Sequence, residues 1–477
     1  MVFSSTIFLF LFLPFTLAGY YLIDRAYKNY FLLTASLVFY AWGEPKFVFI
    51  MIFSIIINHF FALLIDKQLD RERLRSAKIL LTIMVVFNLS FFFIFKYLNF
   101  SIRNLNFLLQ GMGQNAFPQT EIPLPIGISF FTFQAMSYVF DVYYRRGRVQ
   151  TNLMNTALYI SLFPQLVAGP IVRYQTVADE IHERKETIAD FSRGVKRFTI
   201  GLSKKVLLSN ILALAADGAF AASSDISFTT GMGWFGAIAY TLQIYFDFSG
   251  YSDMAIGLGL MLGFHFSENF DHPYLSKSIS EFWRRLHISL GSWFRDYVYI
   301  PLGGSRVNGK ARLIFNLLIV WLLTGIWHGA NWTFILWGLM YFGLLAFEKL
   351  SGLPRKLEKN FAGSLCYQAF TLLAIMVGWV LFRSESINEA IGYILSMFGA
   401  APGGLWDGET GWMFEKYAVV LILGIVACFN WNNVYQNLKK RYPCINVFEV
   451  PIVIGLATIS FSFTVSSTYN PFIYFNF

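Results

Sequence analysis

Long apolar runs recur along almost the whole chain, and they constrain its fold more than any other feature. Some match the ~20 residues that a helix needs to cross a bilayer, and others are shorter. Backbone polar groups inside a bilayer must be hydrogen-bonded within the protein, which favours helices for such runs. We therefore predict an all-α polytopic membrane protein with about 11 transmembrane helices, plus re-entrant or embedded amphipathic helices.

The composition agrees with a membrane protein and argues against a nucleic-acid partner. Apolar residues make up 56% of the chain and charged residues 14%, whereas a soluble domain has roughly 25% charged residues. The formal net charge is +9, and the basic residues gather in short loops between apolar runs. Cytoplasmic loops carry such an excess of lysine and arginine. We expect the lipid bilayer as the principal partner and no nucleic acid.

The basic loops predict an orientation for the chain. Residues 66–78, with arginines and lysines, and residues 141–148, with three arginines, should be cytoplasmic, which places the N-terminus outside. If residues 153–172 crossed the membrane once, residues 173–205 would lie outside. These residues are basic, which instead predicts that they are cytoplasmic. A re-entrant segment at 153–172, broken by its prolines and glycine, resolves the conflict. The C-terminal aromatic run, residues 470–477, is expected to anchor at the membrane interface.

Residues 280–332 contain two histidines among tryptophans, arginines and apolar residues. Ionisable groups at membrane depth are costly, so each is a candidate functional group. Helical periodicity over residues 282–297 separates an apolar arc from a polar arc, with His287 where the two arcs meet. This spacing predicts one amphipathic helix that ends at Pro301.

His328 lies between two apolar segments, residues 313–323 and 332–347. Thr324, Gly325 and Gly329 are small, so the two segments can approach closely around the histidine. We expect a tight slot there. A histidine that only satisfies a core hydrogen bond is the alternative interpretation for His328 and also for His287.

Two imidazoles without a serine or cysteine nucleophile suit direct transfer of an activated acyl group. One neutral histidine would remove a proton from an acceptor hydroxyl, which attacks a thioester carbonyl. An arginine, a tryptophan N–H or the second histidine would support the oxyanion. Two histidines without a thiolate or carboxylate cluster form a weak ligand set, so we predict no metal site.

Two carboxylates, Asp247 and Asp253, lie within an otherwise apolar run. They could pair with Arg284 or Arg285, or orient a histidine. A purely structural ion pair is an equal alternative.

Four stretches together resemble a known family: FSGYSDMAIGLG, ENFDHPY, SEFWRRLHISLGSWFRDYVYIPLGG and LLTGIWHGANWTFILWG. They are similar to the membrane-bound O-acyltransferases, and most of all to the bacterial branch that O-acetylates exopolysaccharides such as alginate. The likeness extends over nearly the whole chain. It implies one integral-membrane domain over residues 1–477, with a catalytic core at about 123–350 and a central funnel.

The resemblance also implies roles for individual residues. His328 matches the essential histidine of the family and would be the base, while His287 would position or stabilise the reacting groups. The residues expected to line the site are Trp283, Arg284, Arg285, Asp253 and Asn331.

For this branch the resemblance implies acetyl-CoA as donor substrate and no bound cofactor. It places the chain in the bacterial inner membrane, with an extracytoplasmic acetyltransferase as partner. Two alternatives stay open. One is D-alanyl transfer to teichoic acid from a carrier-protein thioester, and the other is a proton-coupled transporter. The sequence shows no inverted repeat, which disfavours the transporter.

Overall fold

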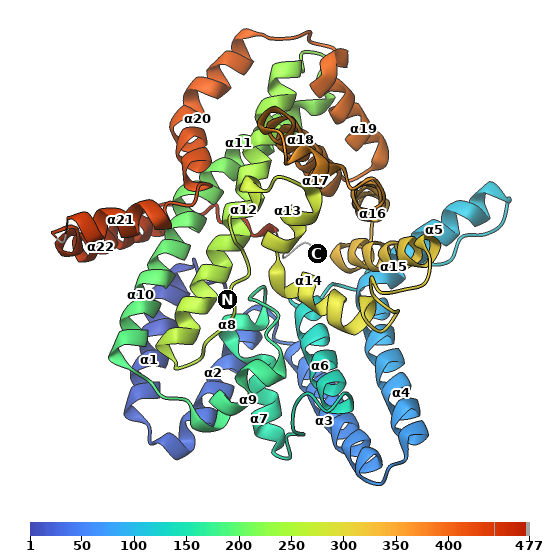
Figure 1. The fold of residues 1–477 in the computed structure, drawn as a ribbon, viewed down its shortest axis with the longest axis vertical. Helices are drawn as coiled ribbons and strands as arrows, with labels where there is room; N and C mark the ends of the chain where they lie inside the picture. Colours follow the sequence, from blue (N-terminus) through green and yellow to red (C-terminus); the bar gives the residue numbers. More distant parts are fainter. Residues whose placement is uncertain (443, 474–477) are drawn as a thin grey trace. The chain divides into compact units, whose positions relative to one another are not determined.

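The computed structural model describes residues 1–442 and 444–473, and these residues fold into helices joined by short connections (Figure 1). The one extended pairing in this part of the chain is an isolated antiparallel bridge between Phe270 and Leu286. The predicted all-α fold class is confirmed.

The chain packs as two compact units. Unit 1 comprises residues Met1–Val195 and Ala255–Ser267, and unit 2 comprises Lys196–Met254 and Glu268–Phe477. The prediction of one catalytic domain, with its core at 123–350, stays a prediction. Two helices run through the boundaries, α10 (Ile188–Ser203) and α12 (Thr230–Met261).

The other helices of unit 1 are η1 (Phe8–Phe12), α1 (Leu13–Leu22), η2 (Arg25–Tyr27), α2 (Lys28–Gly43), α3 (Val48–Asp70), α4 (Leu74–Phe92), η3 (Phe93–Tyr97), α5 (Leu98–Gly111), α6 (Ile128–Tyr143), α7 (Leu153–Ser161), α8 (Phe163–Leu166) and α9 (Tyr174–Glu183). Those of unit 2 are η4 (Lys204–Ser209), α11 (Asn210–Ala221), η5 (Ala222–Ser224), η6 (Pro273–Leu275), α13 (Ile279–Arg285), α14 (Ile288–Phe294), η7 (Arg295–Tyr299), α15 (Lys310–His328), α16 (Trp332–Ser351), α17 (Leu353–Leu357), α18 (Phe361–Arg383), α19 (Ile387–Leu395), η8 (Ser396–Ala400), α20 (Gly408–Ala427), α21 (Asn432–Arg441) and α22 (Ile445–Ser466).

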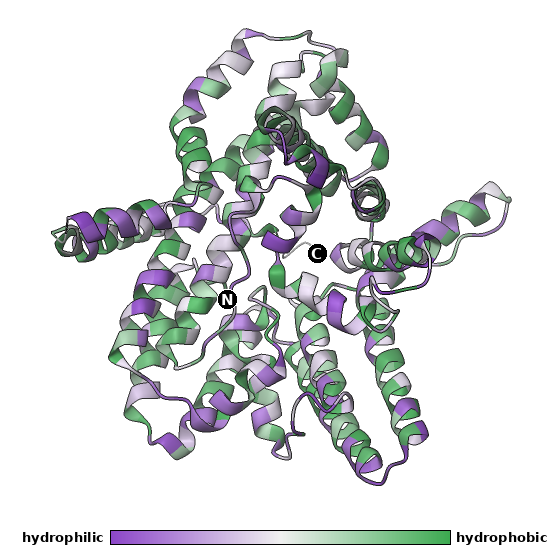
Figure 2. Cartoon of the chain, in the orientation of Figure 1, coloured by the Kyte–Doolittle hydropathy of each residue, from purple (hydrophilic) through white to green (hydrophobic). Residues whose placement is uncertain are grey.

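The chain is a multi-pass membrane protein. In its described part, 8 helical stretches are long and apolar enough to cross a membrane. Figure 2 shows apolar residues along the bodies of these helices and hydrophilic residues at their ends, for example at the turn between α3 and α4. Apolar helices such as α2, with 16 residues, are shorter than a full crossing. The exact number of crossings stays a prediction.

Unit 1 brings together the two basic loops that the sequence places on the same side. Arg145, after α6, forms ion pairs with Asp66 and Asp70 at the end of α3, at 2.6 and 2.5 Å. The segment predicted to re-enter is broken, because α7 has 9 residues and Leu162 is extended before α8 begins. A 9-residue helix is about 14 Å long, which is too short for a crossing.

Unit 2 holds the candidate site, and a buried ion pair fixes the chain's C-terminal segment within it. The Lys205 ammonium lies 2.5 Å from an Asp247 carboxylate oxygen, and both side chains are 1% exposed. Lys205 also donates to the Pro471 carbonyl, while the Ile473 backbone N–H donates to Asp247. Phe472 and Ile473 are buried. The prediction of an interfacial anchor is therefore wrong for these residues, and residues 474–477 lie outside the described part.

Candidate active site

His287 lies at a break between two short helices. Leu286 is extended and His287 has a φ of 48°, in the left-handed region, so α13 ends at Arg285 and α14 begins at Ile288. The prediction of one continuous amphipathic helix over residues 282–297 is wrong. Its apolar arc is present, but the backbone turns at the histidine.

Backbone pairing with a neighbouring segment causes this break. The Asp271 N–H donates to the Arg285 carbonyl at 2.9 Å, and the Ile288 N–H donates to the Asn269 carbonyl at 3.0 Å. These bonds satisfy backbone groups that a continuous helix would satisfy internally. The chain can therefore leave the helix at His287 without losing hydrogen bonds.

Asn269 also determines which nitrogen of His287 carries the proton. The Ser289 backbone N–H donates to the Asn269 Oδ1 at 3.1 Å, so this amide atom must be the oxygen. The Nδ1 of His287 lies 3.3 Å from the same oxygen and must act as the donor. Burial lowers the pKa of His287 to about 3. The ring is therefore neutral near pH 7, and its Nε2 carries the lone pair.

His328 is the last residue of α15, in the tight slot that the sequence predicts. A Cβ on Gly325 would lie 2.5 Å from the Phe334 carbonyl oxygen, and one on Gly338 would lie 2.5 Å from the Trp321 carbonyl oxygen. The glycines thus let α15 and α16 touch along their backbones. His328 is 3% exposed.

Aromatic rings connect the two histidines. The Trp327 ring centroid lies 4.9 Å from that of His328 and 5.9 Å from that of His287. His328 further contacts Trp337 at 4.9 Å and Phe382 at 5.2 Å, and His287 contacts Phe248 at 4.6 Å. Trp327 is thus the shared neighbour of both imidazoles.

One pocket, here called the basic pocket, reaches His287. It has a volume of about 290 Å³, and its walls include Trp283, His287 and Trp321. The charged residues of its lining are Arg284, Arg295 and Lys349, with no carboxylate. The buried Trp283 Nε1–H has no hydrogen-bond partner among the residues that the structure describes. Buried donors normally have a partner, so this N–H is available to a ligand.

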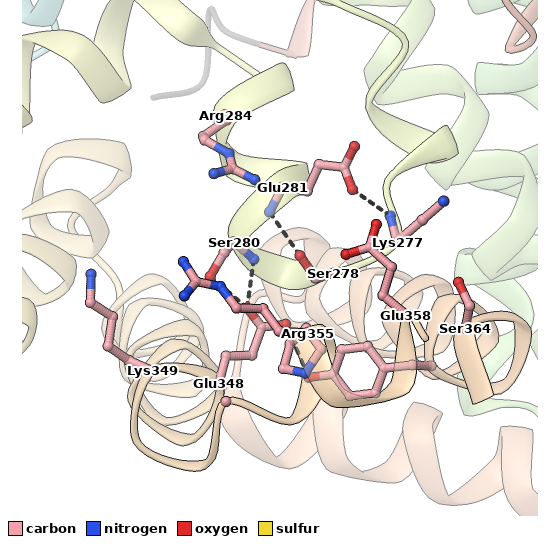
Figure 3. A pocket seen from close by; sticks show the side chains of 13 residues that line it. Lys277, Ser278, Ser280, Glu281, Arg284, Glu348, Lys349, Arg355, Glu358 and Ser364 are labelled. Carbon is pink, nitrogen blue, oxygen red and sulfur yellow. Dashed lines mark hydrogen bonds between the residues drawn. The ribbon is translucent and has the colours of Figure 1, made fainter. Parts of the chain in front are cut away.

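A second hollow of about 580 Å³, the outer pocket, shares Arg284 and Lys349 with the basic pocket. Figure 3 shows these two side chains and Arg355 along its walls. Among the described residues, none of these three cations forms an ion pair with a carboxylate. The Glu348 carboxylate, in the same wall, accepts hydrogen bonds from the backbone N–H groups of Ile279 and Ser280, both at 2.8 Å.

A third hollow, the acidic pocket, has a volume of about 910 Å³. Its walls include Phe382, which contacts His328, and the C-terminal residues Phe472 and Ile473. The charged residues of its lining are Asp217, Arg383, Glu385 and Glu389.

The basic and acidic pockets lie toward opposite ends of the same helices. On α16, Phe334 lines the acidic pocket and Lys349 lines the basic and outer pockets. On α18, Phe382 lines the acidic pocket and Tyr367 lines the outer pocket. Each pair is separated by about 22 Å of helix. His287 lines the basic pocket, His328 contacts Phe382 of the acidic pocket, and Trp327 contacts both histidines.

The other residues predicted for the site are only partly brought together. Trp283 and Arg284 line the basic pocket, and Asn331 lines the acidic pocket. Arg285 pairs with Glu281 at 2.8 Å and lines none of the three pockets.

The two carboxylates of α12 belong to structural ion pairs. Asp253 pairs with Arg197 and Lys204, both at 2.6 Å, and lines none of the three pockets. Asp247 pairs with Lys205, not with Arg284 or Arg285. Both carboxylates thus form ion pairs, with other partners than Arg284 or Arg285, and the role of Asp253 in the site stays a prediction.

Sequence reasoning missed three residues, two that contact the histidines and one in the acidic pocket. Asn269 contacts His287, Trp337 contacts His328, and Gln243 lines the acidic pocket. Asn269 lies within the ENFDHPY stretch, which could have indicated it. No group of three metal-ligating side chains is placed to hold an ion within residues 1–442 and 444–473.

The chain is similar in sequence to known proteins over most of its length. A profile of the membrane-bound O-acyltransferase family matches residues 142–382, which include both histidines. A probable alginate O-acetylase of Pseudomonas aeruginosa is 45% identical over 93% of this chain and 84% of its own length. A peptidoglycan O-acetyltransferase of Helicobacter pylori is 32% identical over 100% of this chain and 98% of its own. A teichoic acid D-alanyltransferase of Bacillus subtilis is 27% identical over 55% of this chain and 70% of its own.

Proposed function

Because the chain belongs to the membrane-bound O-acyltransferase family, we propose that it moves acetyl from cytoplasmic acetyl-CoA to an acceptor hydroxyl outside the cell membrane. The acetyl group would serve the O-acetylation of an exopolysaccharide such as alginate. The relatives that are named alginate O-acetylases support this product. The membrane would be the bacterial inner membrane, and an extracytoplasmic acetyltransferase would act as partner.

The observation that carries the proposal is the pair of oppositely charged pockets on either side of the histidines. A thioester donor with phosphate groups suits the basic pocket, whose charged residues are Arg284, Arg295 and Lys349. Basic residues favour the cytoplasmic side of a membrane protein, where acetyl-CoA is found. The acidic pocket, at the other end of α16 and α18, would admit the acceptor.

His328 is proposed as the general base. The acceptor hydroxyl oxygen attacks the thioester carbonyl, so that a C–O bond forms and the C–S bond breaks. The hydroxyl proton passes to the imidazole and then to the leaving thiolate. A positioned base of this kind contributes roughly 10²- to 10⁴-fold to rate.

His287 and Trp283 take different supporting roles in this proposal. The Nε2 lone pair of neutral His287 can accept a hydrogen bond but cannot donate one. The Trp283 Nε1–H can donate, and it lines the basic pocket. Of the three oxyanion donors considered from the sequence, we therefore favour the tryptophan N–H. His287 would orient the donor or acceptor through its Nε2.

The first test is thiol release from acetyl-CoA by the purified full chain in proteoliposomes. His328→Ala should reduce release by at least 100-fold. The matched control is His265→Ala, because His265 is an exposed residue of unit 1 that contacts Glu180 at 2.7 Å. Loss of release in both variants, or in neither, would contradict the role of His328.

A carrier-protein arm separates the donor classes in the same experiment. An acyl carrier protein loaded with D-alanine replaces acetyl-CoA, with identical vesicles and variants. Release of the carrier thiol that depends on His328, together with no reaction of acetyl-CoA, would replace acetyl transfer by D-alanyl transfer. Flux of a solute without any acyl donor would instead favour a transporter.

A further inference from the structure

The acidic pocket carries a charge pattern that restricts which acceptor can enter it. Its lining holds three carboxylates, from Asp217, Glu385 and Glu389, against one guanidinium, from Arg383. Arg383 is already engaged by Asp217 at 2.5 Å. The carboxylates outnumber the guanidinium, so the lining carries a net negative charge at neutral pH. An anionic acceptor would therefore meet like charge, which disfavours binding.

The carboxylates and the buried polar groups occupy different depths of this pocket. Glu385 is exposed, and the Asp217 side chain is 47% exposed. Gln243, from α12, is 3% exposed yet lines the same pocket. Charge thus gathers where the pocket meets solvent, and an uncharged amide lies deeper.

The side-chain oxygen of Gln243 is the group that points to a ligand. This Oε1 atom is buried and accepts no hydrogen bond from any residue that the structure describes. A buried acceptor without a donor carries a desolvation cost, so such atoms normally have a partner. The missing donor would be an O–H or N–H group of a bound molecule.

We propose that the acidic pocket takes an uncharged polyol as the immediate acyl acceptor, and that Gln243 accepts a hydrogen bond from a hydroxyl next to the reacting one. The inference rests on the proposed function, in which His328 deprotonates the reacting hydroxyl. It adds that a polyuronate such as alginate does not enter this pocket directly. A second acyl transfer, by a separate enzyme, must then move acetyl from the uncharged ester to the anionic polymer.

The test compares two acceptors that differ only in charge. The acceptors are the methyl glycosides of mannuronic acid and of mannuronamide. They share the same ring and hydroxyls, and an amide in the second replaces the free carboxylate of the first. Proteoliposomes of the full chain receive acetyl-CoA and either acceptor, and ester formation is measured. We expect kcat/KM at least tenfold higher for the amide at low salt. The difference should shrink at high salt and in the double variant Glu385→Gln, Glu389→Gln.

A second variant tests Gln243 without changing the charge of the pocket. Gln243→Met keeps the length of the side chain but removes the hydrogen-bond acceptor. It should raise KM for the amide about tenfold. The control is Gln368→Met, because Gln368 donates to the Leu275 carbonyl and lines none of the three pockets.

Several results would overturn the inference while leaving acyl transfer intact. They are equal use of both acceptors by the native chain, thiol release with transfer to neither acceptor, and an unchanged KM in Gln243→Met that folds normally. A native chain without any His328-dependent thiol release would instead overturn the proposed function, and the inference with it.

Discussion

The basic pocket and the acidic pocket are built on the same helices but differ in charge and in how their walls are held. The basic pocket is formed by segments near one another in the sequence, α13 to η7 with α15 and α16. The acidic pocket instead needs the distant C-terminal segment, which the Lys205–Asp247 pair holds. Because different segments form the two pockets, substitutions in one pocket should leave the other unchanged.

Breaking the buried ion pair should have the largest effect, and it should fall on the acidic pocket. Lys205→Met leaves the Asp247 carboxylate buried without its cation. Removal of one partner of a buried pair costs about 3–5 kcal/mol of unfolding free energy. We expect a lower thermal unfolding temperature and a raised acceptor KM. The double variant Lys205→Met, Asp247→Leu should recover stability, and a single variant as stable as the native chain would contradict this account.

Removing the indole N–H in the basic pocket should lower the rate without unfolding the chain. Trp283→Phe keeps an aromatic ring against Trp321 but removes the donor that the oxyanion would use. Loss of one such donor costs about 100-fold in kcat. The control is Trp379→Phe. The Nε1–H of Trp379 donates to the Tyr274 hydroxyl, and Trp379 lines none of the three pockets. Equal rates for Trp283→Phe and the native chain would exclude this N–H from the chemistry.

Neutralising the cations of the basic pocket should weaken donor binding alone. Arg284→Met or Lys349→Met is expected to raise the KM for acetyl-CoA about tenfold, with a weaker salt dependence than the native chain. The matched control is Arg285→Met, because Arg285 is the next residue in the chain but lines none of the three pockets and pairs with Glu281 and Asp271. A change in acceptor KM instead of donor KM would show that the two pockets are not separable.

A further prediction concerns the pH dependence that His287 contributes to stability. Its pKa is lowered to about 3 in the folded chain, against about 6.5 in an unfolded chain. The unfolded state therefore takes up a proton below pH 6.5 while the folded state does not. Stability from this group is complete above pH 6.5 and falls on acidification toward pH 3, by about 1.4 kcal/mol per pH unit.

Unfolding temperatures of the native chain and of His287→Asn, measured between pH 7 and pH 5, test this prediction. The native chain should lose more stability over this range than the variant. Parallel curves would mean that folding does not lower the pKa of His287.

The helical class and the approach of α15 to α16 at His328 could be predicted because they depend on local pattern. Apolar runs favour helices in a membrane, and glycine allows close approach wherever the helices meet. The broken segment α7–α8 was predictable for a similar reason, since the basic loops around it conflicted with a crossing. Trp283, Arg284 and Asn331, each three or four residues from a motif histidine, line pockets, and their roles in the site stay a prediction.

The break at His287 could not be predicted from periodicity. The residues of α13 and α14 keep a helical apolar arc, and only the backbone bonds from Asn269 and Asp271 end the first helix. The same limit applies to Asp253, whose partners Arg197 and Lys204 lie about 50 residues away in the chain. Charge in the sequence shows that a carboxylate needs a partner, but not which one.

The sequence by itself determined a helical, multi-pass membrane protein of an O-acyltransferase family, with two histidines in its central motifs. Hydropathy and motif identity are properties of neighbouring residues, so they can be read without a fold. Only the tertiary structure decided which residues surround those histidines. The tautomer of His287, the buried Lys205–Asp247 pair and the opposite charges of the two pockets all depend on side chains from distant segments meeting in space.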